Sequence, residues 1–228
     1  SESVPYVVGG MFVVLFLCLC AWQITRGLEK RESQQQFDAE SGYSSWSDGM
    51  VVRPFQRLKA AGRYDNERQL LLENIVKDAQ QGFYVITPLR VKDDEPLLLV
   101  NRGWIPRTSR RPDTAPLQLP DKYVTVRGRS GRLPRAGYQK GDPVSVSDAW
   151  PRMAVFPDYD DVAAALGHEV QPFVLLLDAE DEFGFVRDWQ PVKYGPGRHY
   201  GYAFQWFAMA LMLGGLLIWN YRRRGFET

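Results

Sequence analysis

Two long apolar segments near the ends of the chain enclose a polar middle section. Residues 3–25 and 199–221 carry no charged side chain, counting histidine as neutral, and most of their positions are hydrophobic. At about 1.5 Å per helical residue each segment reaches about 34 Å, enough to cross a hydrocarbon core of about 30 Å. We therefore predict a transmembrane helix over each segment, and a single domain over residues 26–198.

The middle section has the alternating pattern of a β-rich domain. Short runs rich in Val, Leu, Tyr and Phe are separated by turn residues, which favours strands. We expect strands at residues 58–64, 69–75, 83–91, 97–104, 122–129, 144–147 and 173–178, a hairpin loop at 92–96 and an extended loop at 107–120. One helix is expected from Asp158, a capping residue, to Leu166, ended by Gly167. The predicted fold is that of a membrane protein with two transmembrane helices flanking one β-rich (α+β) outer-face domain.

The basic tail predicts the orientation. Arg222, Arg223 and Arg224 follow the second span, and the positive-inside rule assigns such residues to the cytoplasm or matrix. Both termini are then expected on that side, with residues 222–228 as a cytoplasmic tail and the domain on the opposite face, in a periplasm or intermembrane space. Basic residues also flank the first span on its outer side, although acidic residues accompany them.

The first span is expected to be a retained anchor. Its apolar stretch is longer than a signal-peptide core of about 7–15 residues. The polar residues 26–32 are expected to continue the helix out of the bilayer. Gly9-Gly10 and Gly214-Gly215 should lie at similar depth in the two spans and allow close packing, unless they reflect only the frequency of glycine in membrane helices.

Composition excludes several kinds of chemistry. Lys and Arg total 28 against 27 Asp and Glu, which argues against a general nucleic-acid binder. Cys18 and Cys20 lie in the first apolar segment, so the middle section has no cysteine for a disulfide or a metal. The nucleophile-elbow and Walker A motifs are absent. The acidic residues 178–182 are interpreted as a solvated turn and the glycine-rich residues 195–201 as an entry turn. We therefore predict that the chain is not an enzyme.

The near-neutral charge conceals two oppositely charged stretches. Residues 101–140 contain ten basic and two acidic side chains, whereas residues 141–182 contain one basic and ten acidic. They could occupy separate faces and steer docking onto a partner, or interleave and form ordinary ion pairs.

Only two histidines are present. His168 follows the predicted helix and is interpreted as a surface or capping residue. His199 begins the second span, with Tyr202 and Trp206 three and seven residues on, followed by Met209 and Leu213 along one helical stripe. An imidazole beside aromatic rings suits haem iron, and Arg198 could pair with a haem propionate. The alternative is an interfacial histidine without a ligand.

Three segments carry a resemblance to a known family. They are Gln81-Gly-Phe-Tyr-Val-Ile-Thr-Pro-Leu89, Val100-Asn-Arg-Gly-Trp-Ile-Pro106 and His199-Tyr-Gly-Tyr-Ala-Phe-Gln-Trp-Phe207. In this order, between two terminal spans, they resemble the Surfeit locus family of cytochrome c oxidase assembly factors over almost the whole chain. In the middle segment we expect Gly103 to allow a bend, Trp104 to pack and Arg102 to bind buried carbonyls.

The resemblance implies a function in the respiratory chain. The family assists insertion of haem a into the catalytic subunit of the oxidase, and its bacterial members are implicated in binding haem a through a histidine of the second span, which matches His199. The expected cofactor-binding residues are His199, Arg198, Tyr202 and Trp206, with His199 as iron ligand and haem a as transient cargo. The alternative is a cofactor-free scaffold or accessory subunit.

The same resemblance implies the partners and the location. The expected partners are the oxidase catalytic subunit and membrane lipid, with haem a synthase as a further candidate and no nucleic acid. A bacterial inner membrane, with the main domain in the periplasm, is favoured over the mitochondrial inner membrane, because no Arg-rich transit segment is evident.

Overall fold

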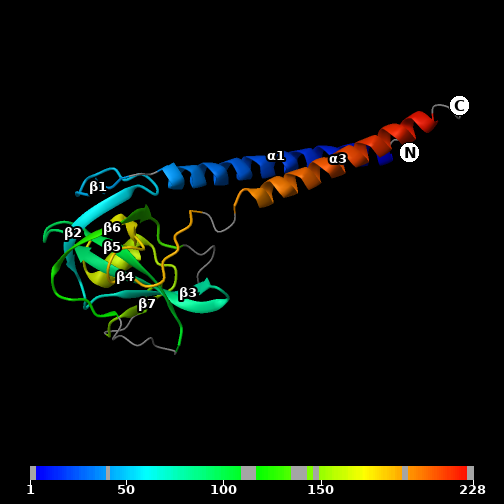
Figure 1. Ribbon diagram of the computed structural model, residues 1–228. Helices are drawn as coiled ribbons and strands as arrows, with labels where there is room; N and C mark the ends of the chain where they lie inside the picture. The colour runs from blue at the N-terminus through cyan, green and yellow to red at the C-terminus, as the bar shows by residue number, and fades with distance from the viewer. Residues whose placement is uncertain are drawn as a thin grey trace. The chain divides into compact units, whose positions relative to one another are not determined.

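The computed structural model describes residues 4–39, 42–108, 117–134, 143–145, 149–191 and 195–224. The chain forms two compact units, one made of Ser1–Ala39 and Gln190–Thr228 and the other of Glu40–Trp189. The first contains the two long helices and the second the sheet (Figure 1). The predicted architecture is confirmed, because two apolar helices long enough to cross a membrane flank a sheet-rich domain in the sequence.

The helical unit consists of α1, Val4–Ala39, and α3, Gly197–Arg224. As expected, α1 continues through the polar residues after the first apolar segment, but it extends as far as Ala39. The compact sheet unit of Glu40–Trp189 lies within the predicted domain of residues 26–198. The polar continuation has no proline or glycine after Gly27, so nothing in its sequence interrupts the helix.

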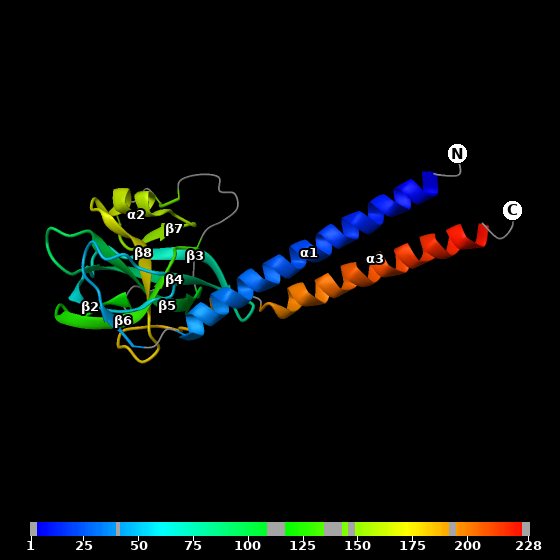
Figure 2. The ribbon, with the colours of Figure 1, turned by 90° about the horizontal axis from the view of Figure 1, so that it is seen from above.

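The two helices lie side by side and antiparallel (Figure 2). Their less exposed positions recur alternately every three and every four residues, the spacing of a left-handed helix pair. On α1 these positions include Tyr6, Gly9, Val13, Phe16, Cys20, Gln23 and Gly27, and on α3 they include His199, Ala203, Trp206, Ala210, Leu213 and Leu217.

Glycine contributes to this packing only in part as predicted. A Cβ on Gly9 would lie 2.8 Å from Leu217, and a Cβ on Gly27 would lie 2.6 Å from the ring of Tyr200. Gly214 and Gly215 have no such neighbour within 4 Å, so the prediction that the two glycine pairs meet is wrong. Instead, a large side chain of α3 fills the space beside each of the two α1 glycines.

Within its described residues, the sheet unit has eight strands and one helix. They are β1 Ser44–Ser45, β2 Arg57–Tyr64, β3 Leu70–Lys77, β4 Gln80–Arg90, β5 Leu97–Pro106, β6 Tyr123–Gly131, β7 Arg152–Ala154, α2 Tyr159–Leu166 and β8 Val170–Leu177. The strand order is β1-β2-β6-β8-β5-β4-β3-β7, and a short additional pairing of β2 with β4 closes five strands into a partly open barrel. Within the barrel, β8 runs parallel to β5 and antiparallel to β6.

Most predicted elements of this unit are confirmed. Six expected strands correspond to β2, β3, β4, β5, β6 and β8, and residues 92–96 join the antiparallel β4 and β5. The expected strand at 144–147 is reduced to one bridge between Val144 and Ala154 where it is described, and residues 109–116 of the expected extended loop lie outside the described residues. Asp158 caps α2, and Gly167 ends it in the left-handed conformation at φ 68°.

Two of the hydrophobic clusters among the described residues form the core of the barrel and its contact with α2. One fills the barrel and takes side chains from all five barrel strands, among them Leu58, Leu89, Val100, Val126 and Leu175. The other packs β3, β5 and β8 against Val162 and Leu166 of α2. Strand β5 contributes alternate residues to both clusters, which explains why Leu97 to Val100 are all buried.

Candidate functional site

His199 lies in the first turn of α3 and is half-buried. Its Nδ1 atom is 2.8 Å from the side-chain oxygen Oε1 of Gln23 in α1. A carbonyl oxygen can only accept a hydrogen bond, so Nδ1 donates its proton and the imidazole is held in the tautomer that leaves a lone pair on Nε2. This histidine can therefore offer Nε2 as a ligand atom while Nδ1 is fixed by the neighbouring helix.

Trp206 lies on the same face of α3, two turns farther along. Its ring centroid is 5.6 Å from that of Phe16 in α1, at an interplanar angle of 32°. Tyr202 is 45% exposed and Met209 is 38% exposed, so both lie beside the face that packs on α1 rather than in it. The expected stripe is thus divided, with His199 and Trp206 at the helix interface and Tyr202 on the outer surface.

Arg198 and Gln23 complete the surroundings of His199. Arg198 precedes the histidine in α3 and is exposed. Gln23 was not among the predicted site residues, although it is the one side-chain amide between residues 3 and 25. A polar side chain inside an apolar span is expensive and commonly functional, so this signal was available in the sequence.

The described residues contain no group of three or more His, Cys, Asp or Glu side chains that could hold a metal ion. Among the described residues, His199 is therefore part of no such group. His168 is exposed and its backbone N–H donates to Ala163 at the end of α2, which agrees with a capping role.

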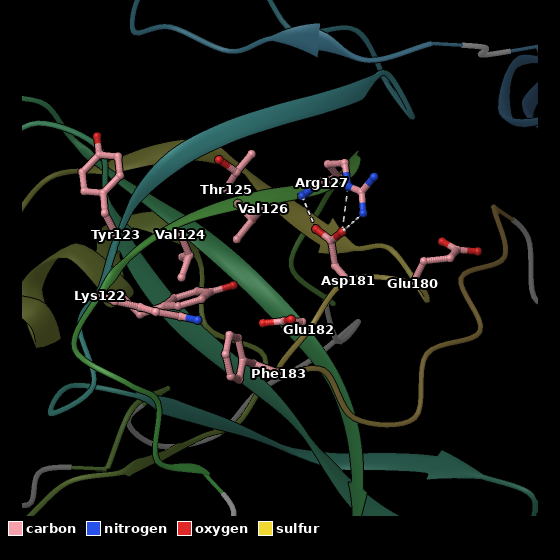
Figure 3. Close-up of a pocket in the computed structure, with 11 residues that line it drawn as sticks. Lys122, Tyr123, Val124, Thr125, Val126, Arg127, Glu180, Asp181, Glu182 and Phe183 are labelled. Atoms are coloured by element: carbon pink, nitrogen blue, oxygen red, sulfur yellow. Dashed lines mark hydrogen bonds and ion pairs between the residues drawn. The ribbon is translucent and has the colours of Figure 1, made fainter.

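The acidic residues after β8 form ion pairs and local hydrogen bonds. Asp178 accepts from Tyr43 and lies 3.4 Å from Arg57. Asp181 accepts from the backbone and the guanidinium of Arg127, with its Oδ1 atom 2.6 Å from Nη2 (Figure 3). Because Arg127 and Asp181 belong to the two oppositely charged stretches, these stretches interleave here instead of forming separate faces.

The segment from Asn101 to Pro106 has a structural role within β5. The pairing of β4 with β5 shifts register here, and Arg102 and Gly103 form a bulge opposite a single residue of β4. The side chain of Asn101 accepts from the backbone N–H of Gly103, whose φ of 114° disfavours other residues. A Cβ at Gly103 would also lie 2.8 Å from the carbonyl oxygen of Val186. The expected bend at Gly103 is confirmed.

Arg102 is buried, with 2% of its surface exposed. Its guanidinium donates to the carbonyl oxygens of Phe183 at 2.8 Å and Leu117 at 3.0 Å, and to the side chains of Gln69 and Thr87. Burial lowers the pKa of Arg102 to about 10, which still leaves it charged at neutral pH. The predictions that Arg102 binds buried carbonyls and that Trp104, 7% exposed, packs in the core are confirmed.

Comparison with known proteins identifies the family. The model of the SURF1 family matches residues 10–211, which include most of α1, the whole sheet unit and the first half of α3. This chain belongs to the SURF1 family. That family is known generally for cytochrome oxidase assembly factors and is not a family of catalytic enzymes.

Three curated relatives of this SURF1-family chain are each named SURF1-like protein. The one from Rickettsia bellii is 23% identical over 234 residues, covering 95% of this chain and 91% of the relative. The one from Drosophila melanogaster is 39% identical over 120 residues, covering 43% of this chain and 40% of the relative. The one from Caenorhabditis elegans is 25% identical over 180 residues, covering 72% of this chain and 50% of the relative. The matches thus span half or less of the two animal proteins.

Proposed function

We propose that this chain binds haem a through His199 and assists its insertion into the catalytic subunit of cytochrome c oxidase. The observation that supports this proposal is the half-buried imidazole at the start of α3, with Nδ1 bonded to Gln23 and Nε2 left as a ligand atom. Haem a is the cargo in this proposal and not a resident cofactor.

The side chains around His199 suit a porphyrin with a long apolar tail. Trp206 and the exposed Tyr202 offer aromatic surface along α3, and exposed apolar side chains such as Phe204 continue it. Arg198 lies next to the ligand histidine at the polar end of the helix, where a propionate would be near water. A carrier must also release its cargo, and a single protein ligand favours release.

The proposed setting is a bacterial inner membrane, with α1 and α3 as spans and the sheet unit on the outer face. The two helices have the length and composition of spans, and the three arginines at the end of α3 favour a cytoplasmic C-terminus. The partners in this proposal are the oxidase catalytic subunit and the lipid around the spans, with haem a synthase as a further candidate.

The experiment is to purify the full chain in detergent from cells that make haem a and to record its absorption spectrum. We expect haem a bands in the wild-type protein and in His168→Ala, which removes the other, exposed histidine. We expect His199→Ala to reduce the haem content to background. Haem-free wild-type protein, or equal haem in His199→Ala, would contradict the proposal. Haem-free protein that still co-purifies with oxidase subunits would favour the scaffold alternative.

A further inference from the structure

We infer that Gln23 is a positioning residue for His199, which holds the imidazole in the tautomer and orientation that present Nε2 to a ligand. The contact between the two side chains supports the orientation and the tautomer of the imidazole. Its consequence for haem rests on the proposed function. The two residues lie 176 positions apart in the sequence, so the pairing depends on the register between α1 and α3.

The position of Gln23 on α1 argues that its amide is directed at the partner helix. Its neighbours Trp22 and Ile24 are 51% and 43% exposed, whereas Gln23 is half-buried among the positions that face α3. An amide in an apolar span must find a hydrogen-bond partner, because lipid offers none. The described side chain that meets this need is His199. The bond gives the Gln23 carbonyl oxygen and the Nδ1–H of His199 a partner each and fixes the ring.

The chemical nature of the partner determines how strongly the imidazole would bind iron. Histidine ligands commonly donate their second ring N–H to a carboxylate or a carbonyl, which fixes the tautomer and increases the basicity of the ligand. A neutral amide oxygen accepts more weakly than a carboxylate. Gln23 would therefore orient His199 firmly and strengthen its bond to iron only modestly, which suits a protein that transfers its ligand.

The first test needs no haem. The full chain is prepared in detergent with isotope-labelled histidine, and nitrogen NMR of the imidazoles is recorded at about pH 8, where histidine is neutral. With only two histidines, a His168→Asn sample assigns the signals. We expect a protonated Nδ1 and an unprotonated Nε2 for His199, and a shift toward a protonated Nε2 in Gln23→Leu. A protonated Nε2 in the wild type, or the same spectrum in Gln23→Leu, would overturn the inference.

The second test measures haem a affinity in Gln23→Leu, Gln23→Glu and the control Gln205→Leu. Gln205 is also a glutamine of the helix pair but is exposed on α3. Removing the hydrogen-bond partner of a metal-binding histidine commonly weakens metal binding about 10- to 100-fold. Of the three variants, we expect only Gln23→Leu to lose haem a affinity by this factor. Gln23→Glu keeps an acceptor and should retain binding, with a lower reduction potential of the iron.

The outcomes separate the two proposals. If His199→Ala loses haem while Gln23→Leu binds it as the wild type does, the positioning role is wrong and the proposed function stands. If His199→Ala keeps its haem, the proposed function is wrong, and the NMR experiment alone decides the tautomer.

Discussion

The buried guanidinium of Arg102 gives the most direct test of how the sheet unit is held together. Replacing it with methionine keeps much of its length but removes every donor. The carbonyl oxygen of Phe183 then loses its donor. The Leu117 carbonyl still accepts from the Gln69 amide at 3.2 Å, and Gln69 and Thr87 still hydrogen-bond to each other at 3.0 Å. A buried acceptor without a partner costs about 1–3 kcal/mol, and here that cost applies to the Phe183 carbonyl.

The net effect should lie in the lower part of that range. Methionine also removes a buried charge whose pKa burial has lowered, and this relief offsets part of the loss. We therefore expect Arg102→Met to reduce the free energy of unfolding by about 1–2 kcal/mol, which corresponds to a fall in Tm of roughly 2–8 °C for a chain of this size.

The assay is denaturant or thermal unfolding of the full chain in detergent, followed by tryptophan fluorescence. Arg63→Met is the matched control, because the Arg63 side chain is 61% exposed and its ion pair with Asp121 spans 3.6 Å at the surface. Such a pair contributes about 0–1 kcal/mol. If Arg102→Met unfolds within about 0.5 kcal/mol of the control, the structural role assigned to this arginine is wrong.

Two further predictions concern the helix pair and a buried tyrosine. In Gly27→Leu the new side chain would meet the ring of Tyr200, and we expect the free energy of unfolding to fall by about 1–3 kcal/mol, measured by melting in detergent. The control Gly10→Leu places its side chain in open space and should melt like the wild type. The phenol oxygen of Tyr64 is buried without a hydrogen-bond partner among the described residues, so Tyr64→Phe should stabilise the chain by about 1 kcal/mol at neutral pH. Burial also raises the pKa of Tyr64 above its ordinary value of about 10, so the wild type should lose stability as the pH rises above about 10. The stability advantage of Tyr64→Phe should then grow with pH. Urea titrations that give the same difference in unfolding free energy at neutral and high pH would contradict this.

Local patterns in the sequence were sufficient to predict the elements. The charge-free segments identified both long helices, and alternation identified six strands, because these signals arise within a few neighbouring residues. Strands β1 and β7 were missed because two and three residues are too few to show alternation. The bend at Gly103 was anticipated, but the bulge there depends on the pairing with β4 and was not.

Contacts between distant segments were predicted less well. His199 was predicted as a site residue but Gln23 was not, because their contact depends on the register of two helices that lie far apart in the sequence. The expected contact between the glycine pairs failed for the same reason, because Leu217 rather than a glycine lies opposite Gly9. The insertion of β8 between β5 and β6 is likewise a non-local pairing that no short segment encodes.

The position of β8 has a consequence for synthesis of the chain. This strand is the last of the sheet to be made, yet it lies between β5 and β6 and pairs with both. Until residues 170–177 have been translated, each of those strands has an unpaired edge, and such edges pair readily with other chains. Because α1 is made first, the nascent chain can already be tethered at the membrane while its sheet is still open, and the barrel closes only shortly before α3 is made.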